Sequence, residues 1–397
     1  MMPYLTTQFG NPSSSHYYGK APRDAIHQAR KSILSLLYPT TTITKWDDVK
    51  EHKAIIFTGC GTEADNLAIH LALEECKPSK HHMTKKHIVT SNVEHPAVEQ
   101  YLKALQGKNE IDVTYVPVNE EGMVGAKDVI QAIQPNTVLV TLMLANNESG
   151  ALQPVQEVSS YCRQHGVLFH TDAAQAVGKV SVALEEDHGI GSNVDMITIV
   201  GHKFGAPKGV ACLYVNPDCS VVSSHGMLLG GGQEHGQRAG TENVPYIVAL
   251  GKACSLLMEH HPVHNKEQWK VNAERMERLR CRLLDNLISS LGSDMVRANG
   301  PKDPSRRLPN TLSVGLKGIQ SGALLEKIQM KVACSAGSAC HSSGGTLSSV
   351  LVAMKVPVEY ARGTLRLSIG PTTTDEEVDV ASHIIAEEVK CQLQQQE

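Results

Sequence analysis

The chain has 397 residues, of which 41% are hydrophobic, and its formal net charge is -4. This length suits one large and one smaller domain, and the apolar content is ample for packed cores. Acidic and basic residues are mixed along the chain, so we expect no nucleic-acid and no membrane partner. The 10 cysteines form no C-x-x-C pair, which indicates reduced thiols in a cytoplasmic protein.

The hydrophobic pattern predicts an α/β fold with a mostly parallel sheet. Residues 1–20 have turn chemistry and are expected to form a loop. Apolar, β-branched runs then alternate with segments of helical periodicity, which is typical of strands joined by crossover helices. The predicted strands are 54–57, 87–90, 113–116, 137–143, 167–170 and 195–200, and the predicted helices are 21–37, 65–74, 97–106 and 154–164.

The pattern changes beyond residue 210 and indicates a second domain. A long helical region is expected over 243–291, with a polar middle at 259–268. Strands are then predicted at 311–314 and 364–368, and helices at 321–330 and from about 374 onward. We therefore expect a large α/β domain over 1–250. Residues 251–397 would form a connecting helix and a smaller α+β domain.

Polar residues follow the predicted strands of the large domain. Lys203 comes directly after the strand 195–200, where desolvation favours the neutral amine that a Schiff base requires. A surface lysine is the alternative for any lysine considered alone. In parallel sheets, ligands bind at the carboxyl ends of the strands. The other polar residues expected there are Gly61, Thr62, His95, Asn147, Asp172 and Gln175.

The segment from Gly59 to Ala64 fits the pattern G-x-G-x-x-A. One alternative is therefore a nicotinamide site, although the acidic residue such a site needs about 20 residues later is not well placed. A second is a phosphate site made by amide groups at a helix N-terminus and the Thr62 hydroxyl. A third is a tight turn with no ligand.

A lysine, an aspartate, a histidine and a phosphate-binding loop together suit pyridoxal phosphate (PLP). The sequence resembles the NifS-like group of fold-type I PLP enzymes, which contains the cysteine desulfurases and the selenocysteine lyases. This group belongs with the class V aminotransferases, and the resemblance implies a seven-stranded sheet and a homodimer. The motifs that carry it span nearly the whole chain: 61–64, 93–95, 146–148, 170–175, 201–203, 238–241, 337–340 and 365–368.

The resemblance also implies roles for single residues of this sequence. Lys203 would form the Schiff base with the cofactor and later move the Cα proton. Asp172 would pair with the pyridine nitrogen and Gln175 with the ring hydroxyl, while His95 would stack on the ring and assist proton transfer. The remaining cofactor and substrate contacts would come from Gly61, Thr62, His202 and, from the other subunit, Thr241 for the phosphate, and from Asn147 and Arg366 for the substrate carboxylate. No metal ligand is implied.

Cys340 is the candidate for the residue that accepts sulfur or assists the release of selenium. It lies among small residues, where a thiolate can be exposed and reactive. Cys334 instead resembles a core residue at a strand end. We expect Cys340→Ala to abolish sulfur release from cysteine while the cofactor remains bound.

The details of several motifs resemble the selenocysteine lyases more than the desulfurases. The segment 339–342, Ala-Cys-His-Ser, and Val200 before Gly201-His202 are the main examples. The sequence therefore predicts a PLP-dependent lyase of selenium metabolism that converts selenocysteine to alanine. A cysteine desulfurase that passes sulfur to an acceptor protein is the first alternative.

Two departures from the family pattern motivate a further alternative. The family's opening strand and Asn-Ala-Thr-Thr-like segment would precede Met1, and Gly205-Ala206-Pro207 replaces the usual Tyr-Gly-Pro after the lysine and phenylalanine. A catalytically impaired binding protein with this fold is therefore the alternative from another functional class.

Overall fold

The computed structural model describes residues 1–40, 53–75, 85–185, 189–223, 225–337 and 347–395. The chain divides into two compact units. The larger unit comprises Met1–Val116, Ala126–Leu144 and Pro154–Trp269, and the smaller unit comprises Pro117–Gly125, Ala145–Gln153 and Lys270–Glu397. Among the described residues, no helix is both long enough and apolar enough to cross a membrane.

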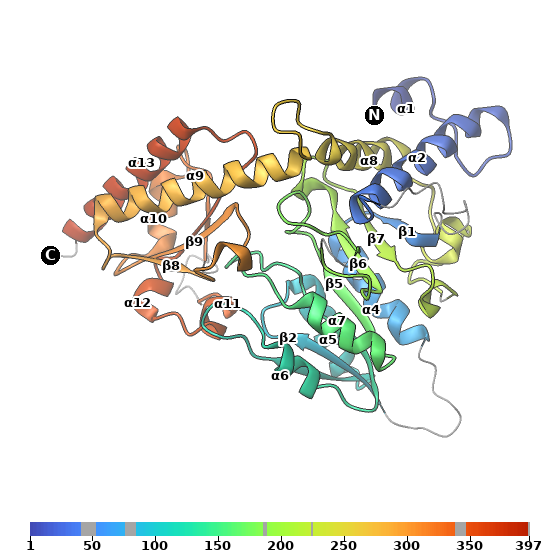
Figure 1. Ribbon diagram of the computed structural model, residues 1–397, viewed down its shortest axis with the longest axis horizontal. Coiled ribbons are helices and arrows are strands. Elements are labelled where there is room, and N and C mark those ends of the chain that lie inside the picture. The colour runs from blue at the N-terminus through green and yellow to red at the C-terminus, as the bar shows by residue number, and fades with distance from the viewer. Residues whose placement is uncertain (41–52, 76–84, 186–188, 224, 338–346, 396–397) are drawn as a thin grey trace. The chain divides into compact units, whose positions relative to one another are not determined.

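A seven-stranded mixed sheet forms the centre of the larger unit (Figure 1). Its order is β1-β7-β6-β5-β4-β2-β3, and only β7 runs antiparallel to its neighbours. The carboxyl ends of the other six strands therefore meet at one edge, and the predicted fold class is confirmed. The strands are β1 (Ile55–Thr58), β2 (Lys86–Ser91), β3 (Ile111–Val116), β4 (Thr137–Thr141), β5 (Leu168–Asp172), β6 (Met196–Val200) and β7 (Ala211–Val215).

Strand β7 was not expected from the sequence. Pro207 and Gly209 precede it and indicate irregular backbone. Its five residues are all buried and pair with both β1 and β6, so tertiary packing rather than local pattern determines it.

The helices of the larger unit pack on the sheet or on one another. They are α1 (Met2–Thr6), α2 (Lys20–Leu37), α4 (Gly61–Glu75), α5 (Pro96–Gly107), α6 (Ala126–Gln131), α7 (Val155–Gln164) and α8 (Val244–Met258). Helices α4, α5 and α7 pack on the sheet, while α1 and α2 pack against α8. The prediction of a loop over 1–20 was wrong in part, because α1 and a 3₁₀ turn at Tyr17–Gly19 lie there. The α1 helix has five residues, none of them buried, so it offers no periodicity to detect.

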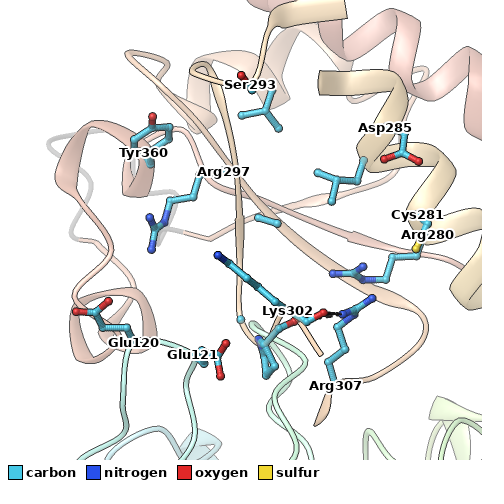
Figure 2. Close-up of a pocket in the computed structure, with 15 residues that line it drawn as sticks. Glu120, Glu121, Arg280, Cys281, Asp285, Ser293, Arg297, Lys302, Arg307 and Tyr360 are labelled. Atoms are coloured by element: carbon cyan, nitrogen blue, oxygen red, sulfur yellow. Dashed lines mark hydrogen bonds between the residues drawn. The ribbon is translucent and has the colours of Figure 1, made fainter. Parts of the chain in front are cut away.

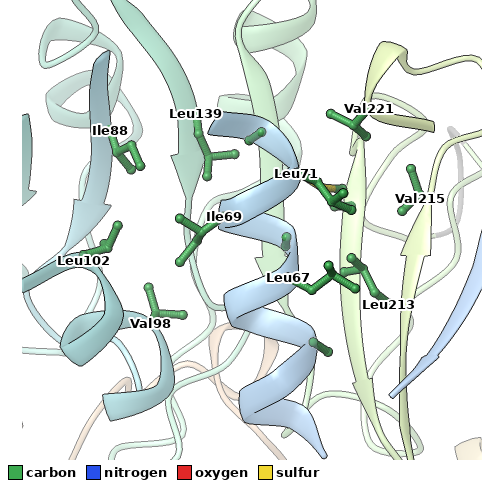
Figure 3. Close-up of a cluster of buried hydrophobic side chains, with 14 of the residues drawn as sticks. Leu67, Ile69, Leu71, Ile88, Val98, Leu102, Leu139, Leu213, Val215 and Val221 are labelled. Atoms are coloured by element: carbon green, nitrogen blue, oxygen red, sulfur yellow. The ribbon is translucent and has the colours of Figure 1, made fainter. Parts of the chain in front are cut away.

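Helix α4 supplies much of the core of the larger unit. Figure 3 shows Leu67 and Leu71 facing Leu213, while Ile69 lies on the other side of the helix near Leu139. Apolar residues around most of its surface explain why the helix is held tightly against the sheet. The start of α4 is therefore a rigid position for the residues that follow β1.

The smaller unit contains a four-stranded antiparallel sheet in the order β10-β11-β9-β8. Its core is formed by apolar residues of β9, β11 and the helices α9, α10 and α13. Helix α13 begins with a capping box between Thr374 and Glu377. The elements are α9 (Gln268–Leu291), β8 (Val296–Asn299), β9 (Thr311–Leu316), α10 (Ser321–Ile328), β10 (Ser335–Ala336), α11 (Ser349–Ala353), α12 (Val358–Ala361), β11 (Leu365–Ser368) and α13 (Asp375–Gln394).

The helical region predicted over 243–291 consists of two helices, α8 and α9. The polar residues around Pro262 lie between them. Proline has no amide hydrogen to donate to a helix, so the break between the two helices falls in the polar segment 259–268 that contains Pro262.

Candidate active site

The predicted site residues of the larger unit follow strands that end at the same edge of the sheet. Asp172 is the last residue of β5 and pairs in register with Thr198 of β6. Lys203 lies at the end of a 3₁₀ turn, Gly201–Lys203, that directly follows β6. His95 follows β2 as the N-cap of α5, and Gly61 is the first residue of α4 after β1. The alternation of strands and helices thus places these groups along one edge.

The glycine loop after β1 is shaped by close packing. A Cβ atom on Gly61 would lie 2.6 Å from Cγ2 of Val200, so only glycine lets α4 begin against the end of β6. The amide of Gly59 donates to Oε2 of Glu63 at 2.7 Å. Thr62 is exposed in the first turn of α4. Amide groups at a helix N-terminus and a free hydroxyl are suitable donors for a phosphate.

Asp172 is a buried carboxylate at the centre of this edge, with an exposed fraction of 7%. Its Oδ1 accepts a hydrogen bond from the amide of Ala174 at 2.8 Å. Burial raises the pKa of Asp172, while the Ala174 amide, and His95 and Lys203 when they are protonated, act in the opposite direction. A cationic N–H group placed against this carboxylate would favour its ionised form in the same way.

The imidazole of His95 has a defined tautomer. Its Nδ1 accepts a hydrogen bond from the amide of Ala97 at 3.1 Å, so in the neutral ring the proton is on Nε2. Desolvation lowers the pKa of His95, Asp172 raises it and Lys203 lowers it. His95 is therefore a neutral ring near neutral pH, which can stack on a flat group and exchange a proton.

The remaining predicted residues of the larger unit are accessible to different degrees. His202 and Lys203 are exposed and Gln175 is half-buried in the turns after β6 and β5, so the expectation that desolvation acts on the Lys203 amine was wrong. The pKa of His202 is lowered by desolvation and by the charges of Lys203 and Lys208. Thr241 is exposed before α8, and whether it acts in another subunit stays a prediction.

Lys179 is a site residue that the sequence analysis did not identify. Only 9% of it is exposed, and its Nζ donates to the carbonyl of Gln175 at 2.9 Å and to that of Lys203 at 3.5 Å. Burial, and then the charge of Lys203, lowers the pKa of Lys179 to about 8. Its amine links the backbones of the two turns that carry Gln175 and Lys203. Lys179 follows the last residue of the motif 170–175 by four positions, and this closeness in sequence was the one sign of its role.

A layer of buried titratable residues lies beside Asp172. His170 of β5 contacts Thr141 at 2.8 Å and Thr198 at 3.1 Å, and burial lowers its pKa to about 3. Glu94 accepts hydrogen bonds from Ser91 and from the amide of Met143, and burial raises its pKa to about 8. Both groups are thus uncharged at neutral pH, which avoids further charge beside Asp172.

The two predicted substrate residues meet in the smaller unit. Nη1 of Arg366, on β11, donates to the carbonyl of Asn147 at 3.2 Å. The preceding Asn146 is buried and shapes this turn, because its Oδ1 accepts from the amides of Glu148 and Ser149. Arg366 is half-buried and keeps further N–H groups for a carboxylate. Cys340 lies outside the described residues.

The family is identified by comparison with known proteins. Residues 1–380 match the model of the family "Aminotransferase class-V". The chain belongs to this family. It is 37% identical to "Cysteine desulfurase IscS" of Clostridium botulinum, a match that covers 98% of this chain and 90% of the relative. It is 39% identical to "Cysteine desulfurase" of a Nostoc species, with coverages of 98% and 88%.

Solved structures that are similar to this chain have the same fold. A protein described as "NIFS-LIKE PROTEIN" superposes with a TM-score of 0.81 at 30% identity, covering 98% of this chain and 94% of the other. "SspA in complex with cysteine" superposes with a TM-score of 0.70 at 29% identity, covering 94% of each chain. The chain is thus a homologue of the NifS-like cysteine desulfurases, as the motifs predicted.

Membership of this family implies PLP as the cofactor, and the residues of the larger unit fit that group. The buried Asp172 carboxylate has one oxygen, Oδ2, without a hydrogen-bond partner among the described residues, which suits a protonated pyridine nitrogen. The start of α4 offers donors to a phosphate, and Lys203 provides an accessible amine. Asp172, Lys203, Thr62 and His95 would hold the group.

Lys179 gives a first test of this arrangement. We expect Lys179→Met to weaken PLP binding about tenfold, because the turns of Gln175 and Lys203 lose their shared donor. The dissociation constant is measured by absorbance titration. Lys208→Met removes an exposed lysine from the same region and is the control, and Lys179→Arg should restore part of the affinity. Equal affinities for Lys179→Met and the wild type would contradict the role of Lys179.

The buried Glu94 leads to a prediction of how the stability of the protein depends on pH. Its pKa is raised to about 8, so between pH ~4.5 and ~8 the folded state keeps a proton that the unfolded state has lost. Glu94 therefore lowers stability as the pH rises through this window, by an amount on the order of a few kcal/mol. Glu94→Gln removes this dependence.

Melting temperatures of both proteins at about pH 5.5 and about pH 8.5 test the prediction. Glu94→Gln should gain stability relative to the wild type at the higher pH. Asp112→Asn, at an exposed position on β3, is the control. Parallel pH profiles of Glu94→Gln and the wild type would show that Glu94 is ionised in the folded protein.

Proposed function

We propose that this chain is a PLP-dependent cysteine desulfurase. The observation that carries the proposal is the pairing of β5 with β6, which brings Asp172 and Lys203 to one edge of the sheet in a chain 37% identical to a cysteine desulfurase. The family and the enzyme class follow from the comparisons. The substrate, the acceptor and the roles of single residues belong to the proposal.

The relatives named above support the desulfurase rather than the selenocysteine lyase that details of the sequence motifs favoured. The lyase remains the second candidate because of Val200 and the segment 339–342. Cysteine and selenocysteine differ in one atom. A site that binds the common carboxylate and amine would accept either, so only the step at sulfur or selenium separates the two enzymes.

When bound, PLP supplies an electron sink that stabilises negative charge at the substrate Cα. Lys203 would hold the cofactor and then move the Cα proton. The neutral His95, with its proton on Nε2, would stack on the ring and exchange a proton with the substrate. Asp172 would keep the pyridine nitrogen protonated, and Gln175 would contact the ring hydroxyl.

Arg366 and Asn147 would bind the substrate carboxylate. A guanidinium can hold a carboxylate by two parallel hydrogen bonds, which orients the Cα–H bond. The hydrogen bond from Arg366 to the carbonyl of Asn147 already limits the rotation of this side chain. Pre-orientation of that kind reduces the entropy lost when the substrate binds.

Cys340 would accept the sulfur. Its thiolate attacks the substrate sulfur and forms an S–S bond while the C–S bond breaks. The electron pair of that bond stays with the carbon, which takes up a proton to give alanine, and the persulfide on Cys340 is then passed to an acceptor protein. A homodimer in which Thr241 reaches the neighbouring site is part of the same proposal.

The test is the release of alanine by the PLP-loaded protein from cysteine and from selenocysteine, measured side by side. We expect turnover of cysteine with a persulfide on Cys340 that mass spectrometry detects. Turnover of selenocysteine alone would support the lyase instead. No turnover of either substrate, with the cofactor spectrum intact, would support the impaired binding protein and contradict the proposal.

The Cys340→Ala variant separates sulfur transfer from cofactor chemistry. It should lose alanine release from cysteine by at least ~10²-fold while its cofactor absorbance is unchanged, because a thiol is needed to accept the sulfur. Cys334→Ala is the matched control. Full turnover of cysteine by Cys340→Ala would remove Cys340 from the mechanism.

A further inference from the structure

The smaller unit contains a pocket of about 760 Å³ that the proposed reaction does not use. All of its lining residues belong to that unit, and they come from α9, Ser293, β8, the segment 300–307, the turn at Glu120-Glu121 and Tyr360 (Figure 2). Pockets of this size accommodate small molecules. Neither Arg366 nor Asn147 lines it.

Positive charge is concentrated in the buried wall of this pocket. Arg280 and Arg307 have exposed fractions of only 5% and 7%. Figure 2 shows their guanidinium groups next to one another, while the side chain of Lys302 extends away from them toward the side of the pocket where Arg297 lies. Arg297 lines the pocket from β8. Two buried cations side by side are unfavourable unless negative charge compensates both.

The protein supplies only part of that compensation. Arg307 forms an ion pair with Glu277 and donates to the carbonyls of Pro301 and Lys302. Arg280 donates from Nε to the carbonyl of Thr311 at 2.8 Å, and its other neighbours are Cys281 and the carboxylate of Glu277, which it shares with Arg307. Burial lowers the pKa of Arg280 and the charge of Arg307 lowers it further, while Glu277 and Cys281 act in the opposite direction.

Unused N–H groups point to a missing acceptor. Among the described residues, Nε of Arg307 and Nε of Arg297 are buried and have no hydrogen-bond partner. A buried donor without an acceptor costs about 1–3 kcal/mol. A planar guanidinium fork matches the oxygens of a carboxylate or a phosphate, so an oxyanion would satisfy both the charge and the donors.

The acidic residues of the pocket limit how much negative charge the ligand carries. Glu120 and Glu121 lie on the side opposite Arg280 in Figure 2, and Asp285 points away from the centre. Their charges disfavour a polyanion such as a nucleic acid. Leu284, Val296 and Tyr360 add apolar surface for the body of a small molecule.

We propose that this pocket binds a small molecule through a single carboxylate or phosphate group, held by Arg280, Arg307 and Lys302. This ligand would bind at a different site from the amino-acid substrate, because the substrate carboxylate is assigned to Arg366 and Asn147. The body of the ligand lies against Leu284 and Val296. Binding fills the space between α9 and the segment 300–307 and stabilises the smaller unit.

The test is calorimetric titration of the PLP-loaded protein with inorganic phosphate and with succinate at constant ionic strength. We expect saturable binding of at least one probe with a dissociation constant on the order of 1 mM or tighter. Phosphate alone would identify a phosphorylated ligand, and succinate alone a carboxylate. If neither probe binds below ~10 mM, the proposal is overturned.

Variants locate the binding. Arg280 is buried and its replacement endangers folding, so the exposed Lys302 is changed instead, as Lys302→Glu, and Arg297→Glu is the second variant. Each should weaken binding at least tenfold. Lys331→Glu, an exposed lysine of the same unit outside the pocket, should bind as the wild type does.

Arg366→Ala separates this site from the proposed substrate site. Unchanged binding in Arg366→Ala supports the pocket, and loss of binding there overturns it. Wild-type affinity in both Lys302→Glu and Arg297→Glu would also overturn it. The desulfurase proposal could be wrong without affecting this test. Lys302→Glu changes a residue of the pocket but none of the residues assigned to the reaction.

Discussion

The parallel pairing of β5 with β6 is the constraint on which the candidate site depends. Asp172 lies opposite Thr198 in that register, so the carboxylate at the end of β5 and the lysine after β6 share one edge of the sheet. A shift by one residue would turn Asp172 to the other face of the sheet and break its relation to Lys203. Burial of both strands fixes the register, because every residue of β6 and all but the first of β5 are buried.

Two ion pairs hold the glycine-rich segment 233–241 to this framework. Arg30 of α2 and Glu234 are both buried and 2.8 Å apart, and Glu234 also accepts from the amide of Phe57 in β1. Arg238 contacts Glu63 in the first turn of α4 at 2.7 Å. Removing one partner of a buried pair leaves an uncompensated charge at a cost of about 3–5 kcal/mol. The segment that carries Thr241 is therefore tied to the same strand and helix that form the proposed phosphate site.

Much of this framework could be predicted from the sequence, because alternating strands and helices imply parallel strands whose carboxyl ends coincide. That rule places the residues that end or follow β1, β2, β5 and β6, which are Gly61, His95, Asp172 and Lys203, at one edge of the sheet. Strand β7 could not be predicted, since its pairing with β1 and β6 is a long-range event that no local pattern encodes. Lys179 was missed because a buried amine bound only to carbonyls has no motif. The pocket of the smaller unit was missed because its arginines come from separate elements.

The substrate preference illustrates the limit of motif details. Single positions such as Val200 favoured a selenocysteine lyase, whereas the relatives matched over 98% of the chain are cysteine desulfurases. The dinucleotide pattern at Gly59–Ala64 was a similar case, since tight packing of Gly61 on Val200 explains that glycine without a nucleotide. Similarity over the whole chain in the first case, and tertiary packing in the second, carry more information than the local sequence pattern.

The proposed function requires that the edge formed by β5 and β6 holds PLP through Lys203. Reduction of the PLP-loaded protein with borohydride fixes the cofactor to the lysine that binds it, and peptide mass spectrometry identifies that lysine. We expect a single modified peptide that contains Lys203. Modification of Lys179 or Lys208 instead, or a cofactor that remains unattached after reduction, would contradict it.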